Sequence, residues 1–332
     1  MNFSIQEICD QIAENREIVK KATFGEVELV RSTAAALITC AGKKADLEKL
    51  KECKQILRKN QGLFSDFRGY SELIIISKMS VQDDPEQYLA DASGVYEILR
   101  DGKFFTSEIM ALAALSIVDS GEKERSREIA EKTRDLLAEM KKKHPFLVDN
   151  DSTAFAALLA LTPKSISEIM YEVETCYEIL KDTFPLHKGS EYALCQVLSI
   201  YDGDPKEKCE QVIRLYQCFK DNDTRYGKEH ELAFLGVLAS LKEPDISIVT
   251  DVADACECLK GHHGFGFLYM DKPKRLLFGS IVAAYNHSAD VKDTAFAVSN
   301  AISAAIVQEI MMIILLTSAS IAVHNASSSS RS

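Results

Sequence analysis

Eight residues between predicted helical units carry imidazole or aromatic side chains that could contact a ligand. They are His144, Phe146, His187, Tyr226, His230, His262, His263 and Phe267. If the units stack, equivalent loops line up along one rim, and such a rim could hold a small ligand or a peptide. Aromatic residues at joints more often pack the seam between units, and histidines there more often cap helix ends. The sequence favours packing and leaves ligand binding as the alternative.

The same histidines do not form a recognisable metal site. Zinc needs ligand nitrogens about 2 Å from the ion, whereas neighbouring helices lie about 8–10 Å apart between their axes. His262 and His263 are adjacent, and consecutive side chains seldom chelate one ion together. Cys256 and Cys258 point to different faces of a predicted helix. We therefore expect no metal site, and in particular no structural zinc.

No motif predicts catalysis or a cofactor. The glycine-rich stretch 261–266 does not follow a predicted strand and lacks the Gly-Lys-Ser/Thr of a phosphate-binding loop. Neither a Gly-x-Ser-x-Gly elbow nor a His-Glu-x-x-His motif occurs. The acidic cluster at 149–151 is too short for a calcium-binding loop. We expect no catalytic residue and no cofactor.

A helical hairpin repeats along the chain and must position these loops. In residues 152–184, a short Ala/Leu run is followed by a turn at Pro163 and a longer helix with an apolar stripe. Similar units recur about every forty residues, as in two-helix repeats. Each has a large apolar residue near the end of its second helix: Leu57, Leu99, Leu137, Leu180, Phe219 and Leu259.

Helix starts and prolines agree with this division. First helices are expected at 34–39, 72–78, 108–118, 153–161, 191–200, 231–241 and 275–285. All seven prolines fall between predicted helices, where they do not disrupt backbone hydrogen bonds. Those inside a unit are expected mostly at the first position of the second helix. Ser71, Ser107 and Ser190 each precede a glutamate and are predicted N-caps.

The sequence predicts an all-α protein with one continuous domain. A capping helix in residues 1–30, with a capping box at Ser4–Glu7, precedes seven hairpin repeats in 31–288. An apolar helix and a serine tail follow in 289–332. We expect an open α-solenoid or superhelix, and the alternative is a closed α/α toroid.

Composition narrows the compartment and the partners. The net charge of -11 argues against nucleic acid, because binding to phosphates depends on Lys and Arg. The odd number of cysteines, nine, does not resemble a secreted disulfide framework, and the N-terminus lacks a secretory signal pattern. We expect a cytoplasmic protein.

The apolar run 310–323 is shorter than the about 20 residues that a membrane span needs. We therefore expect this run to dock on the helical array, and the alternative is that it associates with a membrane.

Two joints carry a resemblance to a known family. They read LRDGKFFTSEIMALAAL in 99–115 and KKKHPFLVDNDSTAFAALLAL in 141–161, and the apolar last helix with its serine tail adds to them. With these features the whole chain resembles an uncharacterised bacterial family of similar length, catalogued as a domain of unknown function. The resemblance implies no activity and no functional residue.

The pattern as a whole favours a non-catalytic helical-repeat protein that binds another protein or a peptide. Stacked hairpins form a long curved surface suited to that role. The alternative is an enzyme or a small-molecule binder with a pocket on the inner face of the array. Buried acids and histidines on the inner helices would favour this alternative, and the predicted inner helices contain few beyond their first turns.

Overall fold

The fold was analysed in a computed structural model. It describes residues 4–23, 25–63, 65–69, 71–101, 107–148, 152–222, 224, 226–228, 231–241 and 246–288. These residues form fourteen α-helices and one short 3₁₀ helix, η1 (Lys123–Arg125), and no strand is found among them. The predicted all-α class is confirmed.

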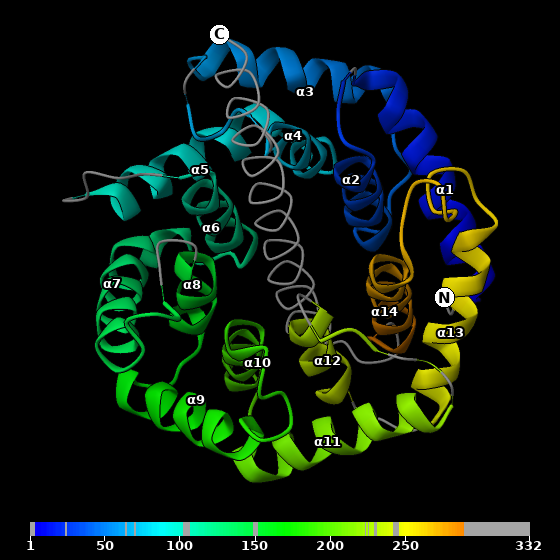
Figure 1. The fold of residues 1–332 in the computed structure, drawn as a ribbon. Helices are drawn as coiled ribbons and strands as arrows, with labels where there is room; N and C mark the ends of the chain where they lie inside the picture. The colour runs from blue at the N-terminus through cyan, green and yellow to red at the C-terminus, as the bar shows by residue number, and fades with distance from the viewer. Residues whose placement is uncertain are drawn as a thin grey trace, which may run out of the picture.

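The helices form a ring and alternate between an outer and an inner layer. Figure 1 shows both layers in a view down the axis of the ring. The outer layer contains α1 (Ile5–Ala22), α3 (Leu47–Asn60), α5 (Pro85–Arg100), α7 (Ser126–Lys143), α9 (Ile166–Leu180), α11 (Pro205–Asp221) and α13 (Ile246–Lys260). The inner layer contains α2 (Glu28–Cys40), α4 (Glu72–Ser80), α6 (Glu108–Asp119), α8 (Thr153–Leu161), α10 (Lys188–Ile200), α12 (Glu231–Ala239) and α14 (Lys272–Ser288).

The two layers differ in how their helices are buried. The outer helix α9 buries one stripe that includes Ile169, Val173 and Leu180, while its other face remains in contact with solvent. The inner helix α12 is buried on all sides. Amphipathic helices belong at a surface, and helices that are apolar all round belong in an interior. The hydrophobic pattern therefore assigns each helix to its layer.

The apolar residues near the ends of the outer helices pack as predicted, with one exception. Leu57, Leu99, Leu180, Phe219 and Leu259 are buried. On α7 the buried residue is Leu136, and Leu137 is only partly buried. The buried stripe of α7 runs through Ile129, Thr133, Leu136 and Met140, and this spacing turns Leu137 away from the core.

Two of the predicted serine caps, Ser4 and Ser107, are confirmed by hydrogen bonds. Ser4 and Glu7 form the expected capping box, and Ser165 and Glu168 form a second one. Pro85 and Pro205 occupy first positions of α5 and α11.

Other predictions were wrong in detail. Ser71 occupies the N-cap position of α4, but its side chain forms no capping hydrogen bond, and Pro163 lies before Ser165, the N-cap of α9. Ser190 lies within α10 because that helix begins at Lys188, and Pro273 lies in the first turn of α14, where no helical hydrogen bond is lost.

The inner helices carry charges that complement their dipoles, with acidic residues at the N-terminal ends and lysines at the C-terminal ends. Five inner helices have a glutamate in the first turn: Glu28, Glu72, Glu108, Glu191 and Glu231. At the opposite ends, lysines cap the last carbonyls. Lys132 Nζ donates to Thr162 O at 2.7 Å, and Lys208 Nζ donates to Leu198 O at 2.9 Å. The inner helices run in the same direction, so these charges offset the repulsion between their aligned dipoles.

The first and last helices of the described array are neighbours. α1 packs against α13 and α14, and α2 contacts α14 (Figure 1). The thiol of Cys9 donates to Ala255 O at 3.8 Å across this seam. The fully buried Arg16 of α1 forms an ion pair with Glu28 and lies beside Gly264, whose φ of +93° suits a residue without a Cβ. These contacts favour the closed arrangement over an open superhelix.

The predicted C-terminal helix and serine tail, residues 289–332, lie outside the described residues, and so does their predicted docking. Within the described ranges, no helix is both long enough and apolar enough to cross a membrane. All nine cysteines are free thiols, in agreement with the prediction that the chain lacks a disulfide framework.

Candidate interaction face

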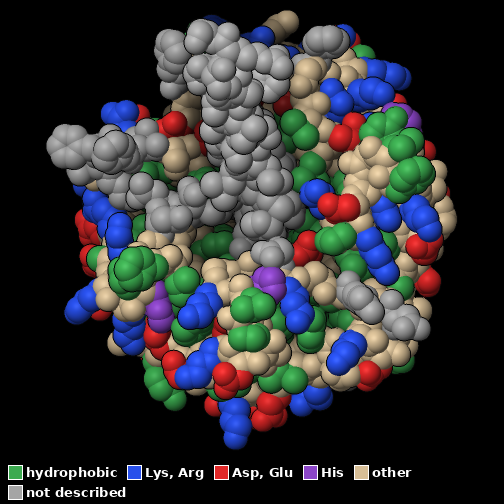
Figure 2. Space-filling view, in the orientation of Figure 1, with side chains coloured by type: hydrophobic (Ala, Val, Ile, Leu, Met, Phe, Trp, Pro, Cys, Tyr) green, Lys and Arg blue, Asp and Glu red, His purple; other side chains and the backbone are tan. Residues whose placement is uncertain are grey.

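Four connections from an outer helix to the next inner helix present large apolar side chains to solvent. These side chains, which we call the apolar rim, are Leu63, Phe146, Leu186, Phe267 and Leu268. Phe146 is 97% exposed and Leu186 is 88% exposed. Figure 2 shows hydrophobic side chains emerging at separate points around one face of the molecule. Single exposed apolar side chains are ordinary at a protein surface, whereas a contiguous exposed apolar patch marks an interaction site.

Phe146 and Phe267 are the two predicted rim residues that belong to this exposed set. Five of the other six predicted residues take different positions, and the sixth, His230, lies outside the described residues. Tyr226 is buried, and its hydroxyl lies 3.1 Å from Ser280 Oγ on α14. His187 precedes α10 at its N-cap position.

His144 packs the seam between units, as the packing interpretation expects. It is the C-cap residue of α7, and its Nε2 lies 3.0 Å from a carboxylate oxygen of Glu174 on α9. Its ring lies 5.0 Å from the ring of Tyr177 and 4.8 Å from that of Tyr192. Burial and the Glu174 carboxylate raise the pKa of the Tyr192 hydroxyl, which keeps it protonated and able to donate to Glu174. This cluster joins α7, α9 and α10.

His262 and His263 lie at the seam where α13 meets α1. His262 Nε2 is 3.1 Å from Asp10 Oδ1, and His263 Nδ1 is 3.6 Å from Glu17 Oε1. The hydroxyl of Tyr269 lies 3.2 Å from His263 Nε2. A pocket of about 400 Å³ lies beside them, lined also by Glu14. Imidazole and carboxylate groups therefore converge where the array closes.

The sequence did not identify the partners of these histidines. Glu174 and Asp10 are on helices, where they look like ordinary surface acids. Leu186 and Leu268 flank joint residues that were identified, and their position in loops was the available signal. A large apolar residue in a predicted loop has no helix stripe to bury it, so it is a better candidate for the rim than a histidine.

The inner helices carry buried hydroxyl groups rather than a cluster of acids and bases. Thr33, Ser77, Ser116, Ser199 and Ser280 each donate to the backbone carbonyl four residues earlier. Such hydroxyl groups satisfy themselves locally and pack as small side chains. They do not require a ligand.

Glu191 differs from these hydroxyl residues. It is fully buried in the first turn of α10, and its carboxylate oxygens have no hydrogen-bond partner among the described residues. Burial raises the pKa of Glu191 from 4.5 to about 7. A carboxyl group that is half protonated near neutral pH could transfer a proton, but the described residues bring no nucleophile or second acid into hydrogen bonding with it.

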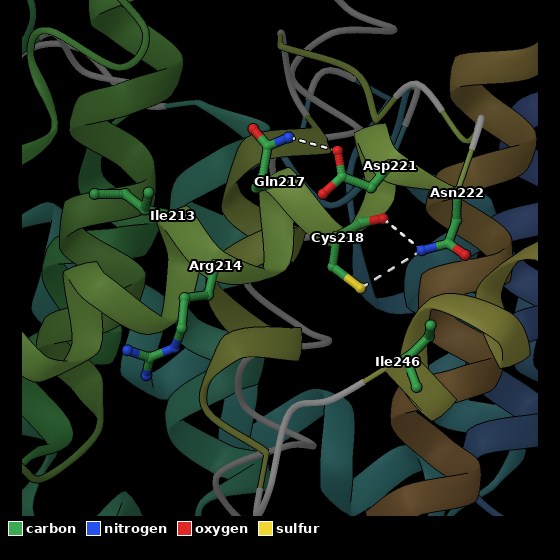
Figure 3. Close-up of a pocket in the computed structure, with 7 residues that line it drawn as sticks. All are labelled: Ile213, Arg214, Gln217, Cys218, Asp221, Asn222 and Ile246. Carbon is green, nitrogen blue, oxygen red and sulfur yellow. Dashed lines mark hydrogen bonds between the residues drawn. The ribbon is translucent and has the colours of Figure 1, made fainter.

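A groove of about 550 Å³ lies on the outer wall between α11 and the start of α13 (Figure 3). Its polar groups pair with one another. Gln217 donates to Asp221 at 2.6 Å, and Asn222 donates to the carbonyl of Cys218 at 2.9 Å. Ile213 and Ile246 supply its apolar surface. Because its amide donors are already paired, this groove offers shape but little specific chemistry.

Comparison with known proteins finds one family. The model of a family described as "Protein of unknown function (DUF4003)" matches residues 16–318. No curated protein and no solved structure matches the chain.

Proposed function

Because the chain belongs to the DUF4003 family of proteins of unknown function, which has no assigned activity to transfer, we propose its function from the geometry. We propose that it is a non-catalytic ring of seven helical-hairpin repeats that binds another protein in the cytoplasm. The apolar rim is the binding surface. The observation that carries the proposal is the exposure of large apolar residues in four outer-to-inner connections of one array.

The rim supplies large apolar side chains that can act as binding anchors. A few large side chains usually supply most of the binding energy of an interface, and the contacts around them contribute little energy but exclude water. Beside Leu63, a groove lined by Asp66, Ser93 and Arg100 could receive polar groups of the partner. The net charge of -11 favours a partner with a basic surface, because long-range attraction increases the rate of encounter.

The inner layer supports a binding role over an enzymatic one. Its buried hydroxyl groups bond to their own helices, so they are not poised toward a substrate. Glu191 is a buried acid with a raised pKa, but none of the described residues forms a hydrogen bond with it as the second group that acid–base catalysis would use.

The test is a variant in which Phe146, Leu186 and Phe267 are all changed to serine. These side chains are exposed, so the fold should survive the changes. Removal of three anchors should weaken binding of the isolated partner by about 100-fold or more. The partner would first be found by cross-linking in cells and then purified for measurement of the Kd.

The matched control is Tyr171→Ser, which removes an aromatic residue that is 68% exposed on the outer helix α9. It should leave the Kd unchanged. Equal Kd values for the triple variant and the wild type would refute the rim as the binding surface. Loss of self-association in the triple variant, measured by sedimentation, would identify a second copy of the chain as the occupant instead.

A further inference from the structure

Three side chains from opposite ends of the described chain meet at the seam between α1 and α13. Asp10 is on α1, Cys258 is in the last turn of α13, and His262 follows that helix. His262 Nε2 lies 3.1 Å from Asp10 Oδ1 and 4.0 Å from Cys258 Sγ. One ligand atom from each residue lies within 4.8 Å of the other two.

Carboxylate, imidazole and thiolate are the three ligand types that zinc accepts from proteins. With bonds of about 2.0–2.3 Å in a tetrahedron, the ligand atoms lie about 3.3–3.7 Å from one another. The observed separations of 3.1 and 4.0 Å lie on either side of this range. We propose that Asp10, Cys258 and His262 bind a zinc ion, which joins the first outer helix to the last.

Local structure holds these ligands in place. Cys258 and His262 are one helical turn apart, and the backbone N–H of His262 donates to Leu259 O at 2.9 Å. The side-chain amide of Gln6 donates to Asp10 Oδ1 at 2.9 Å, which orients the carboxylate. Such outer-shell contacts typically position metal ligands.

The thiol is ready to exchange a proton for the metal. Without metal, a free cysteine is mostly a thiol at neutral pH. Zinc binding would form one Zn–S bond, break one S–H bond and release the proton to solvent. The neighbouring pocket carries Glu14 and Glu17, whose charges attract a cation. It leaves room for a water molecule as the fourth ligand.

This site contradicts the expectation from sequence, which considered the loop histidines without α1. Cys258 and His262 had the right spacing for two ligands on one helix face. The third ligand comes from the other end of the chain and reaches them only because the array closes. Metal binding is therefore coupled to closure of the seam.

The test is titration of the full-length, chelator-treated protein with Co²⁺, which substitutes for zinc and absorbs light. We expect one equivalent to bind and to produce a thiolate-to-cobalt charge-transfer band, which zinc then abolishes by displacement. Cys258→Ser should remove the band, whereas the matched control Cys256→Ser should retain it. His262→Gln and Asp10→Asn should each weaken the affinity for Co²⁺ by at least about tenfold, since even outer-shell changes cost about 10–100-fold.

Thermal unfolding gives a second measurement that does not depend on the cysteine variant being folded. Zinc should raise the Tm of the wild type by a few degrees and that of Asp10→Asn by less. His287→Gln, which removes a histidine paired with Asp251 away from the site, should respond like the wild type. Absence of the charge-transfer band in the wild type, or the same Co²⁺ affinity in the wild type, His262→Gln and Asp10→Asn, would overturn the proposal.

Discussion

Glu191 should make the stability of the protein depend on pH. Burial raises the pKa of its carboxyl group from 4.5 to about 7, so the folded state binds this proton more tightly than the unfolded state. The free energy of unfolding must therefore fall as pH rises from about 4.5 to about 7, and above this window the penalty for burying the charge is complete. The sign is opposite to that of an acid stabilised by a salt bridge.

We expect Glu191→Gln to remove this fall, because an amide carries no charge to desolvate. Relative to the wild type, the variant should gain up to about 3 kcal/mol in free energy of unfolding between pH 5 and pH 8. Urea unfolding at the two pH values measures the gain. Glu131→Gln, at an exposed position of α7, is the control and should keep the wild-type dependence. The same dependence in Glu191→Gln would assign the effect to other groups.

The candidate site residues show which features of a site can be predicted from the sequence. The position of His144 and His262 in joints follows from the predicted repeat, so both could be singled out. Their contacts with Glu174 and Asp10 depend on which helices become neighbours, and the surface pattern of those helices gives no signal for it. Tyr226 shows the opposite error, because a loop residue can be buried when the loop folds over a core.

Among the helices, type and order were predictable, and so were the starts of α4, α6, α8 and α12, but the starts of α2, α10 and α14 were not. The range 153–161 agrees with α8, but α2 begins at Glu28 rather than at 34, and α14 begins at Lys272 rather than at 275. An inner helix is buried all round, so no polar face marks where it starts. α2 also lacks a side-chain cap at Val27, so the usual start signal is missing.

The contact between α13 and α14 depends on a helical glycine. A Cβ added at Gly279 of α14 would lie 2.7 Å from the backbone oxygen of Val252 on α13. Because a backbone atom cannot move without its helix, Gly279→Ala should force the two helices apart. We expect a loss of about 1–3 kcal/mol in free energy of unfolding, measured by urea denaturation.

Gly94 provides the matched control on the exposed side of α5. A Cβ there meets nothing within 4 Å, and alanine is the better helix former. Gly94→Ala should therefore leave stability unchanged or raise it by up to about 1 kcal/mol. If Gly279→Ala were equally harmless, the close approach of α14 to α13 would be wrong.

For the whole molecule, the sequence predicts neighbours along the chain but not closure. A repeat of about forty residues predicts that each helical hairpin packs on the next one along the chain. The rotation from one hairpin to the next decides whether the array opens into a superhelix or returns to its start, and it arises from small differences in packing that no periodicity records. The packing of α1 on α13 is therefore the feature that structure adds.

The closed arrangement predicts which helices a destabilising mutation in α1 should affect. Ile12 is fully buried on α1, and Ile12→Ala should cost about 2–5 kcal/mol. In the closed arrangement, the loosened helix leaves α13 and α14 without a neighbour, so their amide hydrogens should exchange at least about tenfold faster under native conditions.

Leu180→Ala, a comparable truncation on α9, should instead accelerate exchange in α7, α10 and α11. In an open array α1 and α13 would lie at opposite ends, and unchanged exchange in α13 of Ile12→Ala would favour that arrangement. Hydrogen exchange followed by mass spectrometry therefore distinguishes a ring from a superhelix.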